Sequence, residues 1–264
     1  MDILTPENSG PKLSQEPLAM TALDAGRMLM EAGARAKSVE RIVDIFARGL
    51  GAERVDLRVG YASLEITVGA GESGITRMRK VGPVGVNQQL EQRLWDLAER
   101  VARRGLTIEQ VSAELARIEM ETPRHSAWVV ALAVGLACAA FGRLLGVDWA
   151  GIGPVFVAST VGQYVRGVLH SRRVDNFICT TLVSFASCVL AGVGARAARS
   201  ETETTAMVAA ILLLVPGVPA LNAQSDILEG RPTLGSARVV TVVMTLIFIA
   251  AGLWVGRALL SAWQ

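Results

Sequence analysis

The residues best suited to chemistry lie close together between Pro216 and Arg238. Pro216 and Pro219 stand at the end of a long apolar run, and neither can donate a backbone hydrogen bond to the carbonyl four residues earlier. Gly217, between them, lets the chain bend. Carbonyl groups freed inside a membrane must be satisfied by protein, ions or water, and many transporters build their binding sites at such breaks. This stretch is therefore the first candidate for a substrate or ion pathway.

Two polar side chains follow the prolines at helical spacing. Asn222 lies about one turn after Pro219 and Asp226 another turn later, so both share one face of a helix. An amide and a carboxylate there could bind a polar substrate or carry a coupling proton. Arg238 could hold an anion near the cytoplasmic face. The alternative is structural: a packing kink with Asp226 as an anchor at the membrane surface, and Arg238 as a charge that sets orientation.

Secondary candidates for the same pathway lie in two other apolar runs. They are Gln163, and the hydroxyl-bearing Thr180, Thr181 and Ser184. Hydroxyl groups in lipid-embedded helices commonly bond to the backbone or to a neighbouring helix, which is the alternative interpretation. We expect Gln163 and Thr181 to contribute to the pathway if it passes through their helices.

Catalytic chemistry has little support in this sequence. The two histidines, His125 and His170, lie outside any recognisable catalytic motif, and no P-loop or nucleophile motif is present. The three cysteines lack zinc-ligand spacing, and no basic cluster with interleaved aromatic residues suggests nucleic acid. We therefore expect no enzyme, no cofactor and no metal site, and the chain cannot itself drive transport by hydrolysing ATP.

The charged residues are sorted so strongly along the chain that they predict a membrane half. Residues 1–125 carry 17 of the 26 Lys and Arg and 18 of the 24 Asp and Glu, although mean hydropathy over the whole chain is +0.40. Lipid-exposed surface rejects charge, so the boundary falls near Pro123. The charge-free runs beyond it predict about five transmembrane helices: 125–145, 148–168, 176–196, 204–224 and 238–258.

The half before Pro123 reads as a small cytoplasmic α/β domain over residues 20–122, preceded by a disordered segment 1–19. Helical spacing covers residues 20–50, with Gly33 as an interruption and Ser38 as a cap. Alternating apolar residues predict strands at 55–59 and 64–68, and a third at 75–81. Two helices follow, one after Asn87 and one after a capping box at Thr107, giving the order αββαα, or αβββαα when the strand at 75–81 is counted.

The loops predict how the chain is oriented. The first twenty residues lack the apolar core of a signal peptide, so the amino-terminal domain should stay in the cytoplasm. The connection around 166–173 is the most basic one, and the connection around 226–238 holds Arg231 and Arg238; both would face the same side. The carboxyl terminus would then lie outside. Small residues at close-packing spacing, such as Gly252 and Gly256, predict that the helices pack against each other or against a second chain.

Several stretches resemble the threonine/serine exporter family, specifically its amino-terminal domain. The resemblance spans roughly residues 20–260 and is carried by 23–34, 38–42, 64–67 and 214–222, then Asp226, Gly230 and Arg238. It implies a five-span module in the bacterial inner membrane behind a cytoplasmic α/β domain. Fused members carry a second membrane domain, which we expect this chain not to have, since the sequence stops at Gln264 just after the fifth predicted span. It therefore resembles the split members, whose larger subunit pairs with a separate small membrane subunit; one such pair is associated with succinate, whereas fused members are associated with threonine and serine.

These observations together predict a membrane subunit of a secondary exporter. Its expected substrate is a small polar metabolite, a dicarboxylate such as succinate or threonine/serine, and its expected partners are a second small membrane subunit, the lipid bilayer and possible further copies of itself. The alternatives are a non-transporting regulatory or scaffold subunit, and a membrane-associated hydrolase, against which the absence of a nucleophile–base motif argues.

Overall fold

The structure is a computed structural model that describes residues 12–69, 74–122 and 125–262. It divides into two compact units. The first comprises Met1–Pro123 and Val218–Val239; the second comprises Arg124–Gly217 and Val240–Gln264. The segment 218–239, which the sequence assigns to the membrane half, thus packs within the amino-terminal unit. The boundary predicted at Pro123 places this segment in the membrane half and not in the first unit.

The first unit contains two helices, a three-stranded sheet and two more helices. The later segment Val218–Val239 also packs in this unit. Its elements are α1 (Lys12–Glu31), α2 (Ala36–Gly49), β1 (Val55–Val59), β2 (Ser63–Val68), β3 (Ile75–Lys80), α3 (Gln88–Arg104), α4 (Ile108–Glu121), α9 (Gly217–Leu228) and the first residues of α10 (Pro232–Ser261). The three predicted strands and the two helices after them are present. The predicted helical stretch 20–50 is two helices, so the order is ααβββαα.

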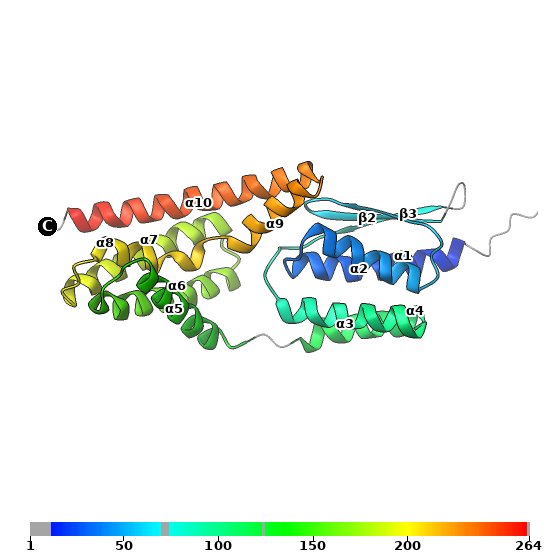
Figure 1. Cartoon of the computed structure of the whole chain (residues 1–264), viewed down its shortest axis with the longest axis horizontal. Helices are drawn as coiled ribbons and strands as arrows, with labels where there is room; N and C mark the ends of the chain where they lie inside the picture. The colour runs from blue at the N-terminus through cyan, green and yellow to red at the C-terminus, as the bar shows by residue number, and fades with distance from the viewer. Residues whose placement is uncertain (1–11, 70–73, 123–124, 263–264) are drawn as a thin grey trace, which may run out of the picture. The chain divides into compact units, whose positions relative to one another are not determined.

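The first unit has three layers. The strands form an antiparallel sheet in the order β1-β2-β3, with Leu57 opposite Ile66 and Ile66 opposite Arg77. Figure 1 shows α1 and α2 as the middle layer, with the sheet on one side and α3 and α4 on the other. Alternate residues of β2, namely Leu64, Ile66 and Val68, are buried, whereas the residues between them are only partly covered. One face of the sheet therefore closes the core and the other remains open.

Helix α1 begins earlier than the sequence predicts. The sequence predicts a disordered segment over residues 1–19. Residues 1–11 of this segment lie outside the described residues, and residues 12–19 are helical. Leu18 and Ala19 are buried, with 5% and 0% of their surface exposed. Leu18, Ala22, Ala25 and Leu29 recur at helical spacing and extend one apolar stripe towards the amino terminus. Packing of this stripe is the reason that the segment is ordered.

The interruption between α1 and α2 falls where it was predicted, at Gly33. Its φ of +89° is in the left-handed region, which favours glycine. Ser38 is not the cap of α2: Arg35 occupies that position, and its side chain makes no capping hydrogen bond. The first backbone amide of α2, at Ala36, instead donates to Asp226 Oδ1 at 3.3 Å. A carboxylate from a distant part of the chain therefore takes the role predicted for Ser38.

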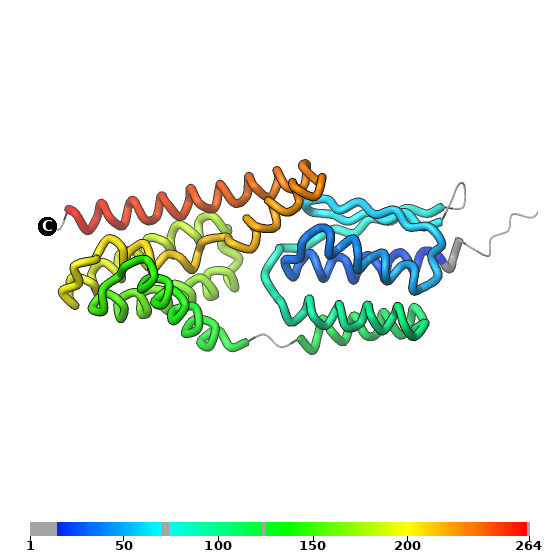
Figure 2. Tube along the Cα trace, in the orientation of Figure 1, coloured from blue at the N-terminus to red at the C-terminus, as the bar shows by residue number. Residues whose placement is uncertain are grey.

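The second unit is entirely helical in the residues that the structure describes. It contains α5 (Ala127–Leu144), α6 (Trp149–Ser171), α7 (Asn176–Ala197), α8 (Glu203–Ala210), a short 3₁₀ helix η2 (Leu212–Leu214) and the remainder of α10. Short turns join α5 to α6 and α6 to α7, and these helices lie side by side in Figure 2. Their starting points match the predicted helices to within about two residues.

Three described helices, α5, α7 and α10, are long and apolar enough to cross a membrane. The number rises to four if the bent pair Glu203–Leu214 and Gly217–Leu228 forms one span. Helix α6 is long enough at 23 residues, but glycine, hydroxyl residues, Gln163 and Arg166 lower its apolar character. Length and composition therefore support three or four spans, and the five predicted from the charge-free runs stay a prediction.

Small residues bring α7 and α10 into close contact. A Cβ added at Gly252 would lie 2.5 Å from the Thr181 carbonyl oxygen, and one added at Gly256 would lie 3.0 Å from Cys188 Sγ. Ser184 Oγ donates to the Ile249 carbonyl at 2.7 Å across the same contact. The predicted close-packing role of Gly252 and Gly256 is confirmed, with α7 as the partner helix.

Candidate functional site

The helical run before Asn222 is broken at Val215 and Pro216. Val215 is extended, with φ −62° and ψ 121°, as the residue before a proline usually is. Pro216 therefore breaks the helix as predicted. Pro219 does not, because it is the third residue of α9, where a missing amide costs no helical hydrogen bond. Gly217 does not have a positive φ, and a Cβ there would meet nothing within 4 Å, so the bend does not depend on glycine.

Protein side chains satisfy two of the carbonyl groups at this break. Ser159 Oγ donates to the Ala210 carbonyl at 3.2 Å, and Arg166 Nη1 donates to the Leu213 carbonyl at 3.4 Å. Both donors come from α6. Groups that the break leaves without helical partners are therefore bonded within the second unit, which meets the requirement for satisfying backbone groups at membrane depth.

Asn222 and Asp226 share one face of α9, as their spacing predicts, and this face packs on the first unit. Asn222 Nδ2 donates to the Gly33 carbonyl at 2.7 Å. Asp226 accepts from the Ala36 amide through one carboxylate oxygen and from Arg238 Nη1 through the other. The Asp226 side chain has no solvent exposure and that of Arg238 has 11%. The structure thus brings three predicted site residues together.

The position of Asp226 combines two favourable interactions with a desolvation cost. The positive end of the α2 dipole faces its carboxylate, and the Arg238 guanidinium neutralises its charge. Burying an ion pair costs desolvation energy that good geometry offsets only in part, but removing one partner leaves the other charge buried and unpaired. The pair therefore ties α9 to α10, and through Ala36 to α2, in a single arrangement.

Arg231 adds a second, more exposed contact beside this pair. Its guanidinium makes two hydrogen bonds to Glu40 of α2, and Nη1 donates to Glu229 at 3.0 Å. The hydrogen bond to Glu40 raises the pKa of Arg231 above its ordinary value. Lys37 lies 4.0 Å from Glu229. The chain between α9 and α10 is thus held on the amino-terminal turns of α2 by charge.

The remaining predicted site residues lie in the second unit. Thr181 Oγ1 donates to the Phe177 carbonyl at 3.1 Å and to the Phe248 carbonyl at 3.3 Å, so its hydroxyl joins α7 to α10. Gln163 is half-buried on α6. The Thr181 contacts match the alternative drawn from the sequence, in which hydroxyl groups bond to a neighbouring helix.

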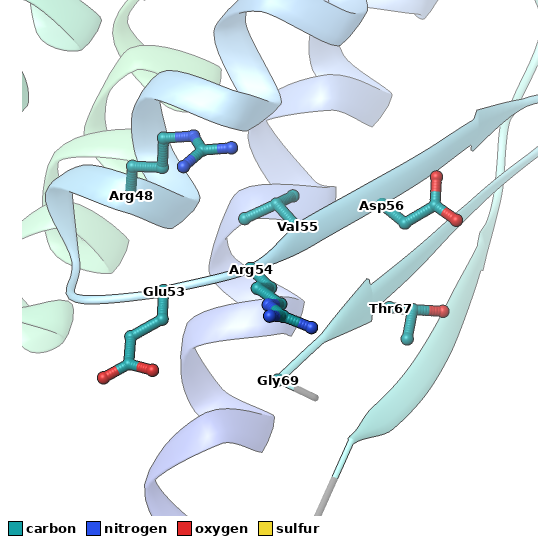
Figure 3. A pocket seen from close by; sticks show the side chains of 7 residues that line it. All are labelled: Arg48, Glu53, Arg54, Val55, Asp56, Thr67 and Gly69. Carbon is teal, nitrogen blue, oxygen red and sulfur yellow. The ribbon is translucent and has the colours of Figure 1, made fainter. Parts of the chain in front are cut away.

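One cavity of about 330 Å³ lies in the first unit, at the end of α2 and the start of the sheet. Figure 3 shows its lining, which includes Arg48, Glu53, Arg54 and Asp56. Arg48 is engaged by Asp44 at 2.7 Å. The lining carries both signs of charge and contains none of the predicted site residues, so the cavity does not mark the candidate site.

Comparison with known families gives this arrangement its context. A family model described as "Putative threonine/serine exporter" matches residues 20–260. The chain belongs to the threonine/serine exporter family. The match covers both units, including the α9 segment and the part of the first unit on which it packs. The resemblance drawn from the sequence is confirmed over the same residues.

Two curated relatives of this exporter-family chain carry the same name, "Probable succinate transporter subunit YjjP". The protein from Klebsiella aerogenes is 29% identical over 228 residues, which cover 86% of this chain and 88% of the relative. The protein from Escherichia coli K12 is 29% identical over 225 residues, which cover 85% and 87%. No solved structure matches the chain significantly. Family membership and the apolar helices identify the chain as a membrane protein of a transport family.

Sequence reasoning missed the partners of Asn222 and Asp226 in this polar site. The Gly33 carbonyl and the Ala36 amide are backbone groups, so no residue type in the sequence identifies them as partners. Glu40 looks like one of many charged residues on a solvated helix face. Within the described residues, no group of three or more His, Cys, Asp or Glu side chains could hold a metal ion. The site's chemistry is therefore that of an amide, a carboxylate and guanidinium groups.

Proposed function

We propose that this chain is a membrane subunit of a secondary exporter for a small polar metabolite, with a dicarboxylate such as succinate favoured over threonine or serine. Family membership supports export, and the name shared by the two relatives supports succinate. The energy would come from a proton or ion gradient. A second small membrane subunit completes the exporter in this proposal, because both relatives are named as subunits.

The Asp226–Arg238 pair is the observation that carries the proposed substrate site. A carboxylate is already bound there by a guanidinium and a backbone amide. A substrate carboxylate carries the same group and could replace Asp226 on Arg238 once the pair opens. Asn222 would form a hydrogen bond to a second polar group of the substrate. The break from Pro216 through Gly217 to Pro219 would let α9 move. Gln163 and Thr181 would line the route elsewhere.

The proposed topology has five spans and a cytoplasmic amino terminus. Helix α6, at 23 residues, is about 35 Å long and could cross the hydrocarbon core as the additional span. Arg172 and Arg173 of the α6–α7 turn and Arg231 of the α9–α10 connection favour the cytoplasmic side for both. The carboxyl terminus then faces the outside of the bacterial inner membrane. The domain boundary stays near Pro123, and the cytoplasmic end of the α8–α9 span packs on the cytoplasmic domain through Asn222 and Asp226.

A second candidate function is that of a regulatory or scaffold subunit without a transport pathway. The contacts of Asn222 and Asp226 favour it, because both side chains are bonded within the first unit. In that case the second subunit carries the pathway, and the bonds of α9 to α2 serve only to hold this chain together.

Metabolite export from cells tests the proposal. The chain is expressed in bacteria that lack their own exporters of this family, alone and with the second subunit, and succinate, threonine and serine are measured outside the cells. We expect succinate export only when both chains are present. No export of any of the three, with both chains confirmed in the membrane, would contradict the exporter proposal.

Two variants separate the two candidate functions. Asn222→Leu removes the amide but keeps the size of the side chain, and Arg103→Gln on α3, where the Arg103 side chain is 78% exposed, is the control. If Asn222 binds substrate, Asn222→Leu should lower export and weaken its dependence on internal succinate concentration, whereas Arg103→Gln should leave export unchanged. Unchanged export and an unchanged concentration dependence in Asn222→Leu would remove Asn222 from the substrate pathway.

A further inference from the structure

The connection between β3 and α3 carries an exposed apolar surface. Residues 82–86 read Gly-Pro-Val-Gly-Val, without a polar side chain. Val84 has 54% of its surface exposed and Val86 has 57%, and Pro83 is also exposed. Single exposed apolar side chains are ordinary, but three in one short uncharged connection form a patch. We call residues 82–86 the apolar loop.

The backbone of the apolar loop is fixed at three points. Gly82 N donates to Glu31 Oε1 at 2.8 Å, Gly85 N donates to the Glu31 carbonyl at 2.8 Å, and Asn87 N donates to the Ala32 carbonyl at 3.0 Å. A Cβ at Gly33 would lie 2.3 Å from the Gly85 carbonyl oxygen, so the loop is also in close contact there. Because its backbone is anchored, the loop presents its valines outward in one fixed arrangement.

The apolar loop and α9 flank the same residue of the first unit. Gly33 contacts Gly85, and its carbonyl accepts from Asn222 of α9. Figure 2 shows the orange α9 and the start of α10 beside the end of the unit where α1 meets α2. Helix α9 exposes Leu221 and Leu228, at 65% and 78%. At this end of the first unit the candidate broken span ends, at Leu228, and the candidate span α10 begins, at Pro232.

Basic side chains lie at the same end of the unit. Arg35, Lys37 and Arg41 are all exposed on the first turns of α2, directly after the Gly33 turn. The nearby acid Glu229 lies 4.0 Å from Lys37 and is also held by Arg231. Exposed cations beside an apolar patch match the negative headgroups of a cytoplasmic membrane leaflet.

We propose that the apolar loop inserts into the surface of the phospholipid bilayer, with Pro83, Val84 and Val86 at the boundary between headgroups and acyl chains. Arg35, Lys37 and Arg41 contact anionic headgroups beside it. The spans already hold the chain in the membrane, so the loop has to orient the first unit rather than supply independent affinity. The occupant is lipid rather than protein, because the helices that adjoin the loop are those that enter the membrane.

Site-directed fluorescence tests this inference on the full chain in lipid nanodiscs that contain phosphatidylcholine and phosphatidylglycerol. The three native cysteines are buried and are replaced by alanine before labelling. An environment-sensitive fluorophore is attached at Val84→Cys. The matched control is Met78→Cys, an exposed apolar position in the same unit, on the open face of β3. Emission is recorded with nitroxide-labelled lipid and, separately, with aqueous iodide.

At position 84 we expect a blue-shifted emission that nitroxide-labelled lipid quenches and iodide does not. At position 78 we expect no blue shift, and quenching by iodide but not by nitroxide-labelled lipid. Equal iodide quenching at both positions would overturn the inference, because position 84 would then face water. A blue-shifted emission at position 84 that neither agent quenches would also overturn it, because protein would then cover the loop. Both labelled sites are on the surface, and an unchanged elution profile confirms that each variant is folded.

Discussion

Asp226 in α9 and Arg238 in α10 form an ion pair in which the aspartate side chain has no exposure to solvent. The same carboxylate accepts a hydrogen bond from Ala36 at the amino terminus of α2. One buried side chain therefore joins α9 and α10 to α2, whose Ala36 lies 190 positions earlier in the sequence. This relationship holds the α9 segment within the amino-terminal unit.

Removing one member of this pair should destabilise the first unit more than removing both. Asp226→Asn leaves the Arg238 guanidinium buried without a charged partner, which typically costs about 3–5 kcal/mol. The double variant Asp226→Asn with Arg238→Gln removes both charges, so it should recover part of that loss. The midpoint of thermal unfolding of the full chain in detergent measures both effects.

The control for this cycle is the exposed pair of Asp44 and Arg48, in which the two side chains are 46% and 54% exposed. Exposed pairs contribute about 0–1 kcal/mol, so Asp44→Asn should change the midpoint little. A double variant at Asp226 and Arg238 that is as unstable as the sum of its single variants would contradict a direct coupling between the two charges.

Gly33→Ala should disrupt the turn on which α9 packs. The residue has a positive φ, and its new Cβ would meet the Gly85 carbonyl oxygen at 2.3 Å, so backbone must move. Gly51→Ala is the matched control, since Gly51 also has a positive φ but a Cβ there meets nothing within 4 Å. The control should cost about 1 kcal/mol from backbone strain alone, and Gly33→Ala clearly more. Equal unfolding midpoints for the two variants would show that the contact with Gly85 is not tight.

Gly252→Ala should loosen the contact between α7 and α10. The added methyl group would lie 2.5 Å from the Thr181 carbonyl oxygen and 2.7 Å from Ser184 Cβ. Gly153→Ala on α6 is the control, because a Cβ there meets nothing within 4 Å. Alanine at position 153 should be neutral or stabilising by up to about 1 kcal/mol from helix propensity. A lower thermal midpoint for Gly252→Ala alone is the expected outcome; similar behaviour of both variants would argue against close α7–α10 packing.

Glu114 should make the first unit sensitive to acid. Hydrogen bonds from Arg100 and then Arg117 lower its pKa from the ordinary value of 4.5. A lowered folded-state pKa gives stability that is complete above about pH 4.5 and is lost as pH falls through the lower folded-state value. Glu114→Gln should reduce this acid dependence in thermal unfolding curves, by under about 1 kcal/mol since the pair is near the surface. An identical pH profile for the variant would contradict the assignment.

Local signals in the sequence predicted the local parts of this fold well. Asn87 caps α3, and the Thr107–Gln110 capping box opens α4, because such caps need only residues three positions apart. The alternation of Leu64, Ile66 and Val68 likewise identified the buried face of β2. Charge-free runs located the apolar helices for the same reason, since crossing a membrane is a property of a single segment.

The contacts that define the candidate site join residues too far apart for local patterns to reveal. Ala36 and Asp226 are separated by 190 positions, and Glu40 and Arg231 by 191. Half of the first contact is a backbone amide, which leaves no trace in residue type. The sequence could therefore predict that Asn222 and Asp226 share a helix face, but not which surface that face contacts.

Transport by purified protein tests the central claim most directly. The full chain and the proposed second subunit are reconstituted into liposomes loaded with radiolabelled succinate, and efflux is followed after a proton gradient is imposed. We expect succinate efflux above that of empty liposomes, and slower efflux when this chain carries Asn222→Leu. The absence of efflux of succinate, threonine and serine from liposomes that contain both folded chains would contradict the assignment of this protein as an exporter subunit.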